Sequence, residues 1–172
     1  MTSFRLSTAL ITVACISLLL FTIPANGQEE GVDKKTLSKA LRSPNSLIRH
    51  DTWSKMNPED KSQFSVLLKI MAKMAWFDRD GTIKALATAA SDEVLEKMIS
   101  TLKKNKDRAV RQGMAVALAK MDDPIFYKHL YEALDDKDPT VRRVVVHSLR
   151  VHKKPEAVDA LVKRFQKEDD PV

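Results

Sequence analysis

A short motif that recurs about every 30 residues constrains the fold of this 172-residue chain more than any other feature. The motif consists of Asp or Asn, two variable residues, Val or Ile, and then Arg or Lys. A repeat of this length is typical of stacked supersecondary units. The sequence therefore predicts an elongated repeat array, which favours a binding surface over a catalytic pocket. The copies start 35, 27, 31 and 31 residues apart, at Asn45, Asp80, Asp107, Asp138 and Asp169.

The first 27 residues have the pattern of a secretory signal peptide. Arg5 provides a basic start, residues 6–23 are uncharged and mostly apolar, and small residues precede the expected cleavage after Gly27. The alternative is an uncleaved membrane anchor, which needs about 20 strongly apolar residues. Ser and Thr interrupt this run, so we favour cleavage. The expected location is therefore secreted or periplasmic, with a membrane contact only through an uncleaved signal.

The remaining residues, 28–172, have the length of one domain. They contain no cysteine, because Cys15 lies in the signal segment, so this part has no disulfide and no thiolate chemistry. Loss of Arg5 leaves 28 basic and 23 acidic residues, a net charge of +5. Such a mild excess permits attraction to anionic partners without requiring it.

Apolar residues recur at helical spacing throughout this part, and strand signals are absent. We expect a linker over 28–32 and an all-α repeat domain over 33–172, built from four helical hairpins and one terminal helix. The first helix of each hairpin is called helix A and the second helix B. The expected repeats are 33–56, 58–90, 92–121, 123–152 and, in part, 155–172. The expected A helices span 33–42, 58–76, 92–104, 123–135 and 155–167. The expected B helices of the first four repeats span 45–56, 80–90, 107–121 and 138–152.

The acidic or amide residue of the motif stands where each B helix begins. Its side chain is expected to accept a hydrogen bond from a free amide of the first turn and to favour the positive end of the helix dipole. Asn57 before Pro58 and Asp123 before Pro124 are expected to cap A helices in the same way. One hairpin cannot bury its apolar stripe alone, so the stripes must meet across repeats.

Two segments, 107–118 and 138–149, resemble HEAT-type repeats of the short bacterial kind that is also seen in phycobilisome lyases. The resemblance covers about residues 79–172 well and residues 33–56 poorly. It implies a right-handed α-α superhelix with the A helices on the convex face and the B helices on the concave face. The residues that carry it are Asp107, Val110, Arg111, Ala115, Ala117, Leu118, Asp138, Pro139, Val141, Arg142, Val145, Ser148 and Leu149.

The resemblance also implies a structural role for the motif residues. The basic residue of each copy would bridge to an acidic residue of an adjacent repeat, forming a ladder along the stack. The expected ladder consists of Asn45, Arg49, Asp80, Lys84, Asp107, Arg111, Asp138 and Arg142.

The same B helices carry the candidate partner-binding residues. A basic concave surface is suited to an acidic protein or an anionic polymer, whereas export argues against nucleic acid, and no aromatic platform for single strands is present. Trp53 and Trp76 either pack in the core or line a partner groove. The candidate partner-binding residues are Arg111, Arg142, Arg143, His147 and Arg150.

No residue set in the sequence points to catalysis, a metal or a cofactor. The histidines lack the i, i+4 spacing of a metal pair, and a zinc site needs three or four converging ligands. The leading hypothesis is thus an exported, non-enzymatic scaffold that binds a protein. The alternatives are binding of an anionic polymer and, from the resemblance, a lyase or chaperone-like activity.

The expected terminal helix raises a separate question. The sequence stops at Val172, where a further B helix is expected to start, so we expect apolar surface near Val162 and Phe165 to stay uncovered. Either the sequence is a fragment, or a second copy or a partner covers that end.

Overall fold

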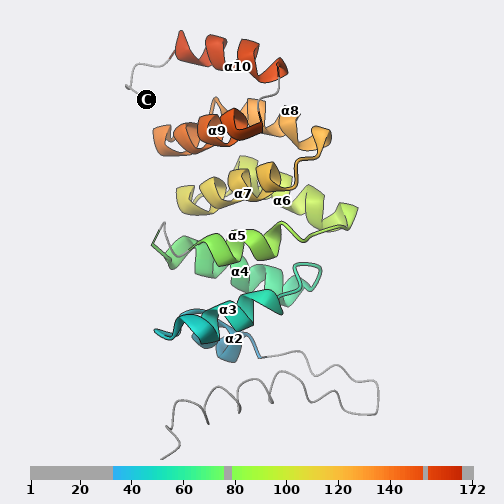
Figure 1. The fold of residues 1–172 in the computed structure, drawn as a ribbon, viewed down its shortest axis with the longest axis vertical. Coiled ribbons are helices and arrows are strands. Elements are labelled where there is room, and N and C mark those ends of the chain that lie inside the picture. The colour runs from blue at the N-terminus through green and yellow to red at the C-terminus, as the bar shows by residue number, and fades with distance from the viewer. Residues whose placement is uncertain (1–32, 76–78, 153–154, 168–172) are drawn as a thin grey trace, which may run out of the picture.

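The computed structural model describes residues 33–75, 79–152 and 155–167, which form a stack of helices (Figure 1). The expected signal peptide, linker and fifth motif copy lie outside these residues, as does Trp76. Within the described ranges there are nine helices and no strand. The helices are α2 (Lys34–Leu41), α3 (Ser46–Ser54), α4 (Lys61–Lys73), α5 (Asp80–Leu86), α6 (Asp92–Lys104), α7 (Arg108–Lys120), α8 (Pro124–Ala133), α9 (Pro139–His152) and α10 (Glu156–Phe165).

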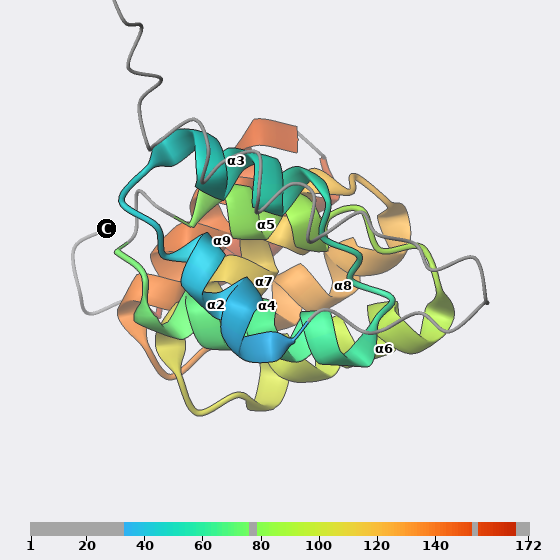
Figure 2. The ribbon, with the colours of Figure 1, turned by 90° about the horizontal axis from the view of Figure 1, so that it is seen from below.

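The helices form two layers, which confirms the expected all-α repeat array. The B helices contact one another in series, α3 with α5, α5 with α7, and α7 with α9. The A helices α2, α4, α6 and α8 lie behind them in Figure 1. Figure 2, which looks along the stack, separates α3 and α5 from α2 and α4. Helix α7 contacts α4, α5, α6, α8 and α9, so it is the most embedded part of the array.

A continuous apolar core fills the space between the layers. The Val of the motif is buried at Val110 and Val141, as are the apolar residues four and eight positions later. Full burial of such a side chain stabilises the fold by about 1.5–3 kcal/mol. The stripes therefore meet across repeats as expected, and they include Met71, Leu86, Met98, Met114, Leu118, Leu130, Val145 and Leu149.

Three motif copies cap their B helices as expected. The side chains of Asn45, Asp107 and Asp138 each accept a hydrogen bond from the backbone N–H two residues later, at 2.8–2.9 Å. The expected cap at Asp80 is wrong. Asp80 is the first residue of α5 because Arg79 already has a helical backbone conformation, so the Asp80 carboxylate lies inside the helix.

The expected start of the second A helix is also wrong. Asn57 accepts a hydrogen bond from the N–H of Glu59 at 3.0 Å and thereby closes a turn ahead of the helix. Asp60 caps α4 instead and accepts from the N–H groups of Ser62 and Gln63 at 2.6 and 3.1 Å. The cap of α8 at Asp123 is confirmed by its hydrogen bond from the N–H of Ile125 at 2.9 Å.

The displaced turn places Glu59 against the next repeat. Its carboxylate accepts hydrogen bonds from the N–H groups of Ala90 and Ser91, at 2.8 and 3.2 Å, and from the Ser91 hydroxyl. The hydroxyl contributes most, and together these donors hold the pKa of Glu59 below its ordinary value. Glu59 therefore links the start of α4 to the N-terminus of α6.

We expect this link to make the array sensitive to acid. A carboxylate whose pKa is lower in the folded state adds stability above its unfolded pKa, about 4.3 for Glu. That stability is lost as the pH falls through the folded pKa. The pKa values of Asp60 and Asp138 are shifted in the same direction, mainly by hydrogen bonds from Ser62 and Thr140.

The measurement compares thermal unfolding by circular dichroism at pH 7 and pH 3. Glu59→Gln should lower the midpoint at pH 7 and narrow the difference between the two pH values. Glu96→Gln removes an exposed carboxylate from α6 and serves as the control. If the midpoint of Glu59→Gln falls between pH 7 and pH 3 by as much as that of the parent protein, this account is contradicted.

Helix α10 ends the described part of the stack. Ala157 is buried, and the Arg164 guanidinium lies 3.3 Å from the Asp135 carboxylate. The adjoining side of the helix is open, since the side chains of Val158, Val162 and Phe165 are 57%, 50% and 79% exposed. The expectation that Val162 and Phe165 stay uncovered is therefore confirmed.

Candidate protein-binding groove

The arginines of the motif hold the turn between the A and B helices of their own repeat. Each donates a hydrogen bond from Nη1 to the backbone carbonyl six residues earlier, which no sequence rule had indicated. The one sequence signal for this hydrogen bond was that a basic residue always follows the motif's Val or Ile. The pairs are Arg49 with Ser43 at 2.7 Å, Arg111 with Asn105 at 2.8 Å, and Arg142 with Asp136 at 3.0 Å.

Arg111 also forms the expected bridge to an adjacent repeat. Its Nε and Nη2 lie 2.7 and 2.9 Å from the two carboxylate oxygens of Asp136, and the side chains are only 3% and 9% exposed. The hydrogen bonds to Asp136 raise the pKa of Arg111. Arg111 is therefore a structural residue, and its expected place on the partner surface is wrong.

The bridge expected for Lys84 is wrong as well. Its ammonium group lies 2.7 Å from the carboxylate of Asp80 in its own helix. Since Asp80 lies inside α5, it stands one helical turn before Lys84, where an i, i+4 ion pair forms readily.

A groove is lined by residues of the B helices α5, α7 and α9. These three helices lie one above another at the front of the stack in Figure 1. The groove has a volume of about 700 Å³, within the range of ligand pockets. Apolar side chains form much of its surface, and charged ones stand beside them. The apolar lining is Ile83, Val116, Ala119, Val144 and Val151, and the polar lining is Asp80, Lys120, Arg143, His147 and Ser148.

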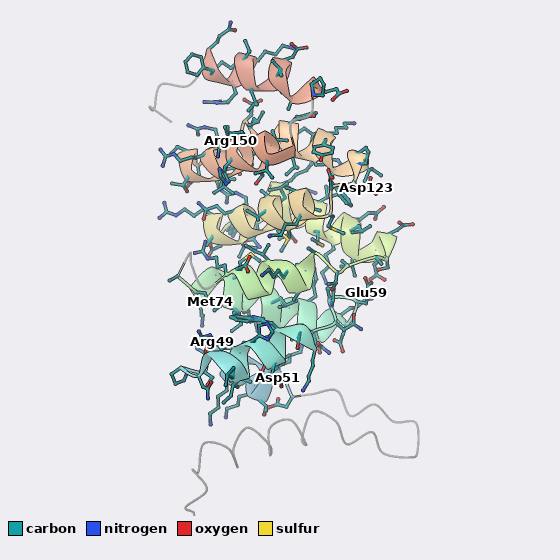
Figure 3. The ribbon with its side chains drawn as sticks, viewed as in Figure 1. Arg49, Asp51, Glu59, Met74, Asp123 and Arg150 are labelled. Atoms are coloured by element: carbon teal, nitrogen blue, oxygen red, sulfur yellow. The ribbon has the colours of Figure 1, made fainter. Side chains whose placement is uncertain are left out.

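Three of the candidate partner-binding residues lie at or beside this groove. Arg143 and His147 line it, and Arg150 is exposed with Nη2 3.5 Å from Nδ1 of His147. Figure 3 shows Arg150 on α9 and Arg49 on α3, in different repeats of the B layer. Arg142 is half-buried and holds its own turn, so it is set apart from the other three.

Sequence reasoning missed the apolar part of the groove. Val116, Val144 and Val151 lie outside the stripes formed by the motif Val and the residues four and eight positions later, and no sequence pattern assigned them a place in a groove. Val151 is 63% exposed. Such exposed apolar surface beside charged residues is a common mark of interaction sites.

Trp53 lies in a second hollow, between α3 and α5. Its indole packs so closely on Gly81 that a Cβ there would lie 2.2 Å from a ring carbon. The side chain is half-buried and packs against the core, while also lining a pocket of about 400 Å³. Trp53 therefore packs against the core as one expectation had it, and its place in a partner groove stays a prediction.

The described residues form neither a metal-ligand cluster nor a membrane span. Among those residues, no three His, Cys, Asp or Glu side chains are grouped so as to hold a metal ion. None of the described helices has the length and apolar character to cross a membrane. Tyr127 donates a hydrogen bond to Asp122, and burial raises the pKa of the Tyr127 phenol, which keeps it protonated.

Comparison with known proteins agrees with this geometry. The sequence pattern of HEAT repeats matches residues 64–150, from α4 into α9. No curated protein sequence matches the chain significantly. The matched segment spans half of the chain and contains the groove helices α5 and α7 and most of α9. With its paired helices, shared core and recurring motif, the chain belongs to the family of HEAT repeat proteins.

Proposed function

We propose that this protein is an exported, non-enzymatic scaffold that holds another protein on the groove of α5, α7 and α9. HEAT repeats generally serve as protein-interaction scaffolds. The observation that carries the proposal is the groove itself, which joins apolar and charged side chains from three repeats. A protein surface offers both kinds of group, since interfaces combine an apolar centre with a polar rim.

The apolar lining favours a protein over an anionic polymer. A polymer bound through its charges would lose about a thousandfold or more in affinity between 50 and 200 mM salt if several charges were neutralised. Binding through Val116, Val144 and Val151 would persist at the higher salt concentration, because burial of apolar surface is not screened by ions.

The test is affinity capture by residues 28–172 from the native envelope fraction. The double variant Arg143→Glu/Arg150→Glu alters the groove, and Lys69→Glu/Lys128→Glu makes the same charge change on exposed positions of α4 and α8. Proteins held by the parent and the control, but lost by the groove variant, are the expected result. Capture that is equal for all three would overturn the proposal.

Export is supported by the charge and hydropathy pattern of residues 1–27. Expression of the full chain in its native cell, followed by fractionation and mass measurement, tests this part of the proposal. The expected product lacks 27 residues and occurs outside the cytoplasm. A full-length protein in the cytoplasmic fraction would rule out export.

Self-association through α10 is a second binding mode that the structure supports. Val158, Val162 and Phe165 form one exposed stripe. The first turn of α10 is acidic and the last turn is basic, at Lys163 and Arg164. In an antiparallel pair of two α10 helices, the acidic end of each copy would therefore face the basic end of the other.

Size-exclusion chromatography with light scattering tests this pairing. The parent protein should form a dimer whose fraction rises with concentration, and Val162→Asp should shift it to monomer. Ile125→Asp changes an apolar side chain of α8 that is 64% exposed and should leave the dimer intact. A parent protein that stays monomeric at high concentration would exclude the pairing.

A further inference from the structure

Two parallel stripes run along the groove side of α9. Arg143, His147 and Arg150 follow a spacing of four and three residues, which places them on one face of the helix. Val144 and Val151 stand one position further round and contribute to the apolar lining of the groove. The groove is therefore bounded along α9 by a basic edge.

The charges of this edge are not neutralised within the described residues. No carboxylate there lies within 4 Å of Arg143 or Arg150, whereas Arg108, Arg111 and Arg164 each have an acidic partner. The acidic group at the groove, Asp80, lies 2.7 Å from Lys84 and 3.9 Å from Lys120. The edge consequently presents positive charge that is available to a partner.

The groove also limits the conformation of its occupant. It crosses three neighbouring helices, whose backbone groups are already paired within the helices, so an extended peptide would find no strand edge to bind. A helical segment satisfies its own backbone hydrogen bonds. Packed helices lie about 8–10 Å apart, so the distance from α5 across α7 to α9 is about 16–20 Å. A bound helix of about 11–13 residues has this length.

We infer that the groove binds an amphipathic helix of a partner protein, with apolar residues on one face and acidic residues beside them. The inference rests on the proposed scaffold function and specifies its ligand. The apolar face of the helix contacts Val116, Val144 and Val151, and its carboxylates face Arg143 and Arg150. Charge-assisted hydrogen bonds to the arginines fix the orientation of the helix, and apolar burial supplies most of the affinity.

The experiment measures fluorescence anisotropy of labelled synthetic peptides with residues 28–172. The probe is a helical peptide of about 14 residues with Leu at positions i, i+3, i+4 and i+7 and Glu beside them. A scrambled peptide of the same composition and a version with Lys in place of Glu are the controls. We expect the probe to bind at least tenfold more tightly than either control, and to retain most of its affinity at 200 mM salt.

Protein variants separate the two stripes. Arg143→Glu/Arg150→Glu should lower the affinity for the acidic probe at least tenfold, because like charges then face each other. The same variant should raise the affinity for the Lys version, whose charges are now opposite to those of the groove edge. Val144→Asp/Val151→Asp should lower the affinity for both peptides, and Lys69→Glu/Lys128→Glu should leave both affinities unchanged. Circular dichroism checks that each variant keeps the parent's helix content.

Two outcomes would overturn the inference. One is equal binding of the probe and the scrambled peptide, together with tighter, salt-sensitive binding of heparin, which would identify a polymer site. The other is the absence of any peptide binding. If the groove variant still loses captured proteins in that case, the scaffold function stands and only the helical acidic ligand is wrong.

Discussion

Replacing Arg111 with alanine is expected to lower the free energy of unfolding by about 3–5 kcal/mol. The change leaves the Asp136 carboxylate, 9% exposed, without the guanidinium that pairs with both of its oxygens. It also removes the donor to the carbonyl of Asn105, which closes the turn before α7. One substitution thus opens a turn and separates two repeats, which explains the size of the expected effect.

Urea unfolding followed by circular dichroism measures this effect, and Arg108→Ala is its control. The Arg108 guanidinium lies 3.6 Å from the Asp138 carboxylate, but its side chain is 66% exposed. Exposed pairs contribute about 0–1 kcal/mol, so the control should cost little. If Arg111→Ala and Arg108→Ala lower the free energy of unfolding equally, the buried bridge contributes no more to stability than the exposed pair.

The second large effect is expected for Leu118→Ala, at about 2–5 kcal/mol. Leu118 is fully buried in α7, the helix that contacts both layers of the neighbouring repeats. The cavity left by the lost side chain cannot close easily, because helices pack around it on several sides. In a repeat array, weakening a central unit also reduces the coupling between its two neighbours.

Leu41→Ala makes the same chemical change at the end of the described stack. Leu41 is also fully buried, but among the described helices α2 contacts only α3 and α4 strongly. Hydrogen exchange should show faster exchange in α2 and α3 for this variant, and across α5 to α9 for Leu118→Ala. A uniform increase along the whole array in both variants would indicate a single cooperative unit instead.

The fold followed from the sequence to a large extent, and the errors can be traced to particular residues. The bounds of α6 were predicted to the residue, because Ser91 precedes a clear apolar stripe and Asn105 ends it. The start of α4 was misplaced by three residues because Asn57 and Asp60 are both good caps. The cap at Asp60 accompanies a contact that local sequence does not reveal, between Glu59 and Ala90 and Ser91 just before α6.

The candidate site was predicted only in part. Arg143, His147 and Arg150 were identified by their basic character and their place on a B helix, and they do lie at or beside one groove. Arg111 had the same character in the sequence but is buried against Asp136. The difference is made by a residue 25 positions away, which no local pattern reveals.

The sequence by itself determined the repeat unit, the all-α class and most helix boundaries, because caps and apolar periodicity act over a few neighbouring residues. The tertiary structure alone decided which apolar side chains line the groove and which arginine of the candidate site is buried. That outcome depends on how each repeat packs against the next. Arg111 and Arg143 are both basic residues of B helices, yet the packing of adjacent repeats buries Arg111 against Asp136 and leaves Arg143 exposed at the groove.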